Sequence, residues 1–134
     1  MHSVAVVILN WNGIDDTVEC LSGLENQTYR NFDIIVVDNA SEDSSVTTLE
    51  SLENITLLKN STNKGFAGGV NTGIRFALDK NYTYVALLNN DATPDDNWLG
   101  SLVAASEMHS DTAIITGLLL SRSEEHTSEL QSRG

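Results

Sequence analysis

Residues 4–13, VAVVILNWNG, decide the fold: six consecutive apolar side chains lead directly into polar residues and a glycine. Similar apolar runs occupy residues 34–37, 55–58 and 84–88, and a fifth lies at about 112–119. Strands that are apolar on both faces are typical of parallel sheets covered by helices. The sequence therefore predicts a mostly parallel sheet.

The segments between these runs carry apolar residues at helical spacing. A fourth helix should begin at Pro94, with Thr93 as its N-cap. Because strand and helix alternate and such connections are right-handed, we expect an α/β fold with helices on both faces of the sheet. The residues expected to face the sheet are Ile14, Val18, Leu21 and Leu24, then Val46, Leu49 and Leu52, then Val70, Ile74, Ala77 and Leu78, and finally Trp98, Leu99, Leu102 and Val103.

The chain is acidic: it has 134 residues, with 7 Lys and Arg against 19 Asp and Glu and a formal net charge of -12. This charge excludes the basic surface that nucleic-acid binding requires, so no nucleic-acid partner is expected. The length suits one domain, and the single cysteine, Cys20, is expected to be a small core residue. We find no secretory leader and no apolar run of the roughly 18–20 residues that span a bilayer, which predicts a cytoplasmic protein without a transmembrane segment.

Residues 122–134, RSEEHTSELQSRG, have no apolar period and resemble the translation of a common sequencing adapter. We expect a domain over residues 1–121 followed by a non-native or disordered tail. A natural polar tail is the alternative.

Four polar segments follow the predicted strands, at residues 10–13, 38–43, 60–69 and 89–94. The carboxyl ends of parallel strands meet at one rim of the sheet, where open α/β folds bind ligands. The first segment, NWNG, lacks the GxGxxG of a dinucleotide site, and the chain has no P-loop motif. No histidine lies in these segments, which excludes a Ser-His-Asp triad.

The first two segments suit recognition of a nucleotide base. Asn10, Trp11 and Asn12 place an aromatic face between two amides; alternatively, Trp11 caps the sheet and the amides cap the first helix. Asp38 ends a buried strand and can accept a hydrogen bond from the imide N–H of uracil or thymine. Because an unpartnered buried carboxylate is costly, Asp38 requires a ligand or a backbone partner. Ser41 is expected to cap the next helix.

The third segment is rich in glycine. Gly65, Gly68, Gly69 and Gly73 surround the start of a helix, with Lys64 beside them. Glycine lets backbone approach a ligand, and a helix N-terminus favours negative charge. The alternative is that the glycines serve tight turning and packing of the helix on the sheet, which is the expected role of Gly73.

The fourth segment, NNDATP, is a candidate metal loop. An acidic chain that binds a diphosphate needs a cation, and Mg²⁺ or Mn²⁺ commonly takes one or two carboxylates and completes its shell with phosphate oxygens and water. Asp91 would supply the carboxylate, and Asn89 and Asn90 neutral oxygens. The alternative is an Asx-turn before the next helix, with no metal.

Taken together, VVILNWNG, IIVVDNASED, NKGFAGGVNTG and LLNNDATP resemble, in order and spacing, the donor-binding half of family 2 glycosyltransferases, above all the rhamnosyltransferase-like members. The resemblance covers residues 4–120 and implies a truncated GT-A type fold. It implies that the first two loops hold the base, the glycine-rich loop lies against the nucleotide sugar, and the fourth loop holds the metal. The nucleotide-binding residues would be Asn10, Trp11, Asn12, Asp38, Asn39, Lys64, Gly65, Asn71 and Asn90, and the metal ligands Asn89 and Asp91 with Mg²⁺ or Mn²⁺.

The same resemblance implies an inverting enzyme of cell-surface polysaccharide biosynthesis. Its donor would be a UDP- or dTDP-sugar and its acceptor a glycan or lipid-linked glycan, with the protein cytoplasmic or peripheral at the inner membrane face. Asn89 stands where the family's DxD motif begins with Asp. Family members continue into an acceptor-binding half that supplies the general base, for which this chain offers no candidate. The alternative is a catalytically inactive, truncated domain that self-associates through the apolar strand AIITGLLL, residues 113–120.

Overall fold

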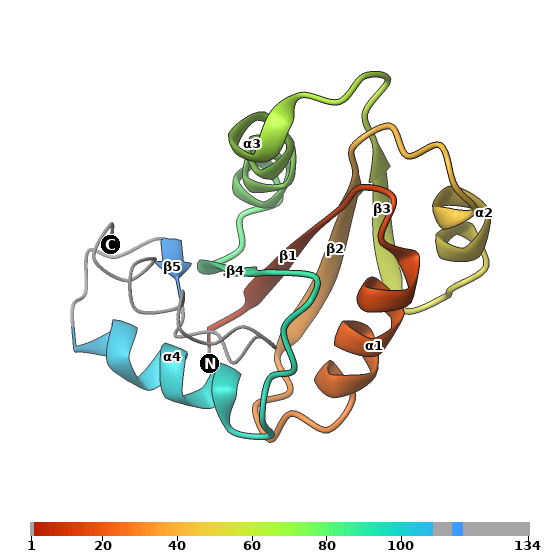
Figure 1. The fold of residues 1–134 in the computed structure, drawn as a ribbon. Helices are drawn as coiled ribbons and strands as arrows, with labels where there is room; N and C mark the ends of the chain where they lie inside the picture. The colour runs from red at the N-terminus through yellow and green to blue at the C-terminus, as the bar shows by residue number, and fades with distance from the viewer. Residues whose placement is uncertain (1, 109–113, 117–134) are drawn as a thin grey trace.

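A computed structural model describes residues 2–108 of the chain and the backbone of residues 114–116. Strands and helices alternate along this part of the chain (Figure 1). The elements are β1 (Val4–Asn10), α1 (Ile14–Leu24), β2 (Phe32–Asp38), α2 (Ser45–Glu50), β3 (Ile55–Lys59), α3 (Gly65–Asp79), β4 (Tyr84–Leu88), α4 (Trp98–Glu107) and β5 (Ile114–Thr116). The sheet order is β3-β2-β1-β4-β5 and every pairing in it is parallel, which confirms the predicted α/β class.

Helices cover both faces of the sheet, as predicted (Figure 1). Val4, Val6 and Ile8 of β1 pack in one core cluster with residues of α1, α2 and α4. Ala5 and Val7, which point to the opposite face, pack with residues of α3. The unbroken apolar run of β1 follows from this arrangement, since successive side chains of a strand face opposite layers.

The helices bury partly different residues from those predicted. Val18, Leu52 and Leu78 are 43%, 36% and 49% exposed, whereas Thr17 and Cys20 are fully buried. The prediction for Cys20 is therefore confirmed, and those for Val18, Leu52 and Leu78 are wrong. Thr17 can occupy the buried face because both its hydrogen-bonding capacities are satisfied there, as described below.

The predicted start of α4 at residues 93–94 is also wrong, because the helix begins at Trp98. A buried glutamine, Gln27, explains the shift. Its Nε2 donates to the carbonyl of Asp95 at 2.5 Å, and its Oε1 accepts from the amide of Leu99 at 3.0 Å. An α-helix would join these two backbone groups directly, so the Gln27 side chain replaces the first helical hydrogen bond and delays the helix.

Some predictions fall on residues that the structure does not describe. β5 lies inside the predicted strand at 112–119, and the remainder of that segment is outside the described residues. The same holds for the proposed tail at 122–134 and for its boundary with residues 1–121. Among the described residues, no helix is both long and apolar enough to span a bilayer.

Candidate functional site

The polar loops meet at the carboxyl rim of the sheet, as predicted. The register places Asn10 opposite Asp38 across β1 and β2, and Ile8 opposite Leu88 across β1 and β4. The loops that follow β1, β2 and β4 are therefore neighbours in space. Hydrogen bonds that involve side chains join the loop after β1 to the loop after β2. Another joins the loop after β1 to the loop after β4.

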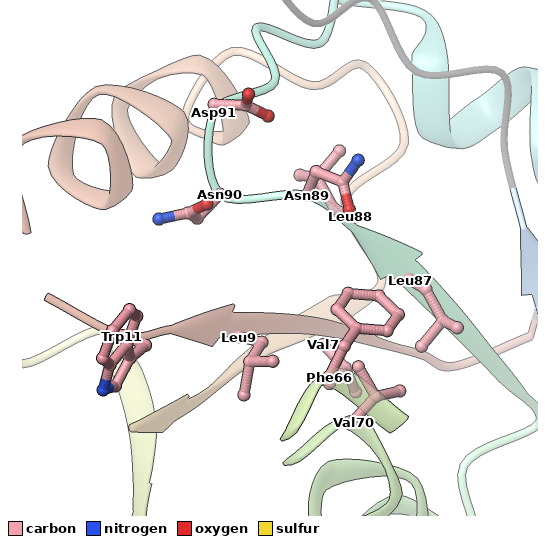
Figure 2. A pocket seen from close by; sticks show the side chains of 10 residues that line it. All are labelled: Val7, Leu9, Trp11, Phe66, Val70, Leu87, Leu88, Asn89, Asn90 and Asp91. Atoms are coloured by element: carbon pink, nitrogen blue, oxygen red, sulfur yellow. The ribbon is translucent and has the colours of Figure 1, made fainter. Parts of the chain in front are cut away.

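A pocket of about 350 Å³ opens at this rim. Its apolar wall comes from β1, β4 and α3, and includes Leu9, Val70 and Leu87. Two aromatic side chains at the pocket, Trp11 and Phe66, are 53% and 62% exposed. Figure 2 shows Asn89, Asn90 and Asp91 on the side of the pocket opposite to Phe66 and Val70. The pocket thus joins exposed aromatic surface to a polar, carboxylate-bearing loop.

Asp38 is almost fully buried, at 1% exposure, and is held by polar partners. Its Oδ1 accepts from Asn10 Nδ2 at 2.9 Å and from Ser41 Oγ at 2.7 Å, and its Oδ2 accepts from the Ser41 amide at 2.9 Å. The predicted backbone partner of Asp38 is therefore confirmed. The prediction that Ser41 caps the next helix is wrong, because α2 begins at Ser45 and the Ser41 hydroxyl is engaged with Asp38. Oδ2 keeps a second lone pair, although Asp38 is not among the residues that line the pocket.

Asn12 fastens the first loop to the second. Its side-chain Oδ1 accepts from the backbone amides of Glu42 and Asp43 at 2.7 and 3.3 Å. Its backbone amide donates to Ser41 Oγ at 2.9 Å. No side chain caps the N-terminus of α1, so the alternative that the loop amides cap this helix is wrong. The structure instead presents the ring of Trp11 to the pocket, on a loop anchored by its polar neighbours.

Asn39 holds the glycine-rich segment in place. It is 2% exposed, and its Oδ1 accepts from Asn60 Nδ2 and the Lys64 amide, both at 3.1 Å. Its Nδ2 donates to Asn63 Oδ1 and the Gly65 carbonyl, both at 3.0 Å. All four hydrogen-bonding positions of this amide are used within the protein, so Asn39 can act on a ligand only through the loop that it positions.

The glycines of α3 have two different roles. A Cβ on Gly69 would lie 2.5 Å from Leu9 Cδ1, and one on Gly73 would lie 2.5 Å from Val7 Cγ1, so both permit close packing of α3 on β1. This is the role expected for Gly73. Gly65 instead has a φ of +76° with open space around it, which suits a turn beside a ligand. Asn71, the other predicted sugar contact on α3, is exposed.

The fourth loop fits a cation that also binds a phosphate. The described residues contain no cluster of three or more His, Cys, Asp or Glu side chains that could hold a metal by itself. Asp91 is partly exposed and lines the pocket with Asn89 and Asn90. One carboxylate with neighbouring amide oxygens suits Mg²⁺ or Mn²⁺, which take few protein ligands when phosphate oxygens complete the shell. The turn itself contains a backbone hydrogen bond from the Ala92 amide to the Asn89 carbonyl, at 3.1 Å.

Two residues of the site, Thr17 and Phe66, were absent from the sequence prediction, and Ser41 was predicted only as a helix cap. Thr17 was detectable as a polar residue on the same helical face as Ile14, Leu21 and Leu24. Phe66 was detectable as a large aromatic within a run of glycines. The bridging role of Ser41 left no mark in the sequence, because it depends on loops brought together by the sheet.

The family model described as Glycosyl transferase family 2 matches residues 5–133. The chain belongs to this family. One relative of this family 2 glycosyltransferase is an uncharacterized glycosyltransferase of Haemophilus influenzae, 29% identical over 108 residues, which covers 78% of this chain and 32% of the relative. Another is the UDP-Glc:alpha-D-GlcNAc-diphosphoundecaprenol beta-1,3-glucosyltransferase WfaP of Escherichia coli, 27% identical over 106 residues, which covers 78% of this chain and 39% of the relative. The chain thus spans between about a third and two fifths of the length of these relatives.

Solved structures show the same fold. S. aureus TarS 1-349 in complex with UDP is similar with a TM-score of 0.69 and 21% identity, over 81% of this chain and 33% of that one. The mannosyltransferase PcManGT from Pyrobaculum calidifontis, in complex with GDP-Man and Mn²⁺, has a TM-score of 0.62 and 25% identity, over 69% of this chain and 28% of that one. The predicted family and the GT-A type fold are confirmed, while the rhamnosyltransferase-like subtype stays a prediction. These similarities do not favour the alternative of an inactive domain.

Proposed function

We propose that this chain is the donor-binding part of an inverting glycosyltransferase and binds a UDP- or dTDP-sugar through Mg²⁺ or Mn²⁺. The observation that carries the proposal is the rim pocket, which joins the exposed Trp11 ring to the Asp91 loop. The structures most useful for comparison have UDP, UDP-GlcNAc, or GDP-Man with Mn²⁺ bound.

Each predicted residue then has a place in donor binding. The base stacks on Trp11 and its imide N–H donates to Asp38 Oδ2, within a frame made by Asn10, Asn12 and Asn39. The diphosphate and sugar lie toward Lys64, Gly65 and Asn71. Asn89 and Asp91 hold the cation, and Asn90 is beside them. The cation offsets the repulsion between an anionic ligand and a chain with a net charge of -12.

We further propose that the acceptor, a glycan or lipid-linked glycan, is bound by sequence beyond the donor-binding part. The E. coli relative WfaP is named for transfer to a diphosphoundecaprenol-linked sugar. A role in cell-surface polysaccharide biosynthesis, in the cytoplasm or at the inner membrane face, agrees with such an acceptor. Because inverting transfer requires a general base, the 134-residue chain alone should show negligible turnover.

Calorimetric titration with UDP, dTDP and GDP, each with and without Mn²⁺, tests the proposal. We expect binding of UDP or dTDP that strengthens when Mn²⁺ is present and weakens after chelation. Asp91→Ala should remove the effect of Mn²⁺. The matched control is Asp79→Ala, because Asp79 is an exposed carboxylate at the last residue of α3, far along the helix from the rim. Nucleotide binding that is insensitive to metal and to Asp91→Ala would reject the metal site.

Self-association through the edge at residues 113–120 is a separate proposal. β5 pairs with β4 alone among the described strands, and an apolar edge strand pairs readily with another chain. Light scattering over a range of concentrations should give a mass above that of one chain at high concentration. A monomer mass throughout would reject this proposal and leave donor binding untouched.

A further inference from the structure

The hydroxyl of Thr17 lies between two amide side chains that belong to different loops. Thr17 is fully buried in α1, one turn after its start. Its Oγ1 donates to Asn10 Oδ1 at 2.6 Å and accepts from Asn90 Nδ2 at 3.1 Å. Thr17 therefore connects the loop after β1 with the loop after β4.

The chemistry of the hydroxyl determines the direction of every bond in this chain of contacts. A threonine hydroxyl has one proton, and Thr17 donates it to Asn10 Oδ1. The other end of that amide, Nδ2, donates to Asp38 Oδ1 at 2.9 Å, which prevents Asn10 from turning over. Thr17 can then only accept from Asn90, so Asn90 must present its nitrogen.

The carbonyl of Gly13 supports the same orientation of Asn90. It accepts from Asn90 Nδ2 at 3.4 Å, so two acceptors face the nitrogen of this amide. The amide oxygen is consequently turned away from α1. Figure 2 shows the nitrogen of Asn90 directed away from Asn89 and its oxygen on the side nearer to Asn89. Asn90 and Asp91 both line the pocket.

We infer that Thr17 is a positioning residue that keeps Asn90 Oδ1 turned toward the cation and the donor. It also couples the loop after β4 to Asp38, the proposed partner of the nucleotide base. The inference rests on the proposed function. Its consequence is that metal and nucleotide strengthen each other's binding through a path that contains no ligand contact by Thr17 itself. A hydrogen-bonded network can transmit such a constraint because each bond fixes the orientation of the next side chain.

The test measures how many fold Mn²⁺ tightens UDP binding in the 134-residue chain. Thr17→Val keeps the shape of the side chain and removes the hydroxyl, and should reduce this gain about tenfold, as expected for loss of one orienting hydrogen bond. Thr17→Ser restores the hydroxyl and should keep the gain within about twofold of the native value. If Thr17 had a purely structural role, Thr17→Val would weaken UDP binding with and without Mn²⁺ by the same factor, and the gain from Mn²⁺ would not change.

A second measurement uses the unmodified protein without ligand. Hydrogen exchange of the Asn90 side-chain amide, followed by NMR, should be slow compared with that of the exposed Asn71. Equal, fast exchange would overturn the inference even if Thr17→Val does not fold. If the native chain binds UDP with a gain from Mn²⁺ and Thr17→Val keeps that gain, the inference fails and the proposed function stands. If the native chain shows no such binding, both fail.

Discussion

Of the described residues with a left-handed φ, Asn81 lies in the turn before β4 and the others lie at the rim. Asn12, Ala40 and Gly65 have φ values of 50°, 66° and 76°, one in each of three neighbouring loops. Glycine and asparagine adopt this left-handed region readily, but alanine rarely does. Ala40 follows Asp38 and Asn39, whose hydrogen bonds hold the turn in place. The surrounding contacts thus maintain an unfavourable conformation where the ligand is proposed to bind.

Trp11 should contribute to binding far more than to stability. Because its ring is 53% exposed, Trp11→Ala should change the free energy of unfolding by less than about 0.5 kcal/mol, while loss of base stacking should weaken UDP binding about tenfold or more. Calorimetry and urea unfolding measure the two effects.

The matched control for Trp11 is Trp98, which is 7% exposed. With Trp98→Phe, the remaining Trp11 fluorescence should change when UDP is added. With Trp11→Phe, the remaining Trp98 fluorescence should not change. A response from Trp98 alone would contradict the assignment of the base to Trp11.

Tyr82 makes stability depend on pH in the alkaline range. Partial burial and a hydrogen bond to Asp33, together with the charge of that carboxylate, raise the pKa of Tyr82 from 10.0 to about 12. The folded protein therefore holds this proton more tightly than the unfolded chain does. Its stabilising contribution is complete below about pH 10 and is lost as the pH rises to about 12. The urea midpoint of the native protein should fall more steeply over this interval than that of Tyr82→Phe, and parallel profiles would refute the link.

At the scale of elements, the close contact of α3 with β1 requires glycine at position 73, where a side chain would not fit. Gly73→Ala would place a methyl group 2.5 Å from Val7 Cγ1 and 3.1 Å from Val37 Cγ2. We expect it to lower the free energy of unfolding by about 1–3 kcal/mol. Gly100→Ala, in α4, is the control, since its new Cβ would lie 3.8 Å from the nearest heavy atom, Tyr29 Cβ, and it should raise stability by about 0.5–1 kcal/mol. Urea unfolding of both variants measures the contrast, and equal effects would disprove it.

The link between Gln27 and α4 joins elements that are distant in sequence. Gln27→Ala would leave the Asp95 carbonyl and the Leu99 amide without their side-chain partner, and should destabilise the fold by about 2–4 kcal/mol. Gln27→Met fills the space without restoring either hydrogen bond, and should be nearly as unstable. If Met recovered most of the stability on thermal unfolding, packing and not polar pairing would explain the role of Gln27.

At the scale of the whole molecule, charge opposes folding. The net charge is -12, and the ion pair Lys59–Glu50 lies at the surface, where such pairs contribute little. Repulsion among the excess carboxylates destabilises the compact state. The same repulsion favours the cation that we propose for donor binding at the rim.

Salt should therefore stabilise this protein without any specific ligand. The Debye length falls from about 30 Å at 0.01 M to about 8 Å at 0.15 M, so the melting temperature should rise by a few degrees across this range. Sodium chloride and choline chloride should act equally at matched ionic strength. A fall in melting temperature with salt would show that attractive pairs outweigh the repulsion.

The strands and the convergence of the loops were predictable, but several helix details were not. The β4 prediction, 84–88, agrees with the observed Tyr84–Leu88 because an apolar run on both faces is a local property. The start of α4 was not predictable, since the capping signals at 93–94 are overridden by Gln27, a residue brought in from the loop after α1. Likewise the choice of Thr17 over Val18 for the buried face depends on Asn10 and Asn90.

By itself, the sequence determined the alternation of strands and helices, the parallel sheet, and the set of polar residues that follow its strands. Only the tertiary structure decided which of those residues line the pocket at the rim and which serve as partners for one another, such as Asn39. The physical reason is the separation along the chain over which each kind of interaction acts. Hydrophobic periodicity acts between near neighbours in the chain, whereas the pairing of Asn10 with Asp38 joins residues 28 positions apart and exists only once the sheet has formed.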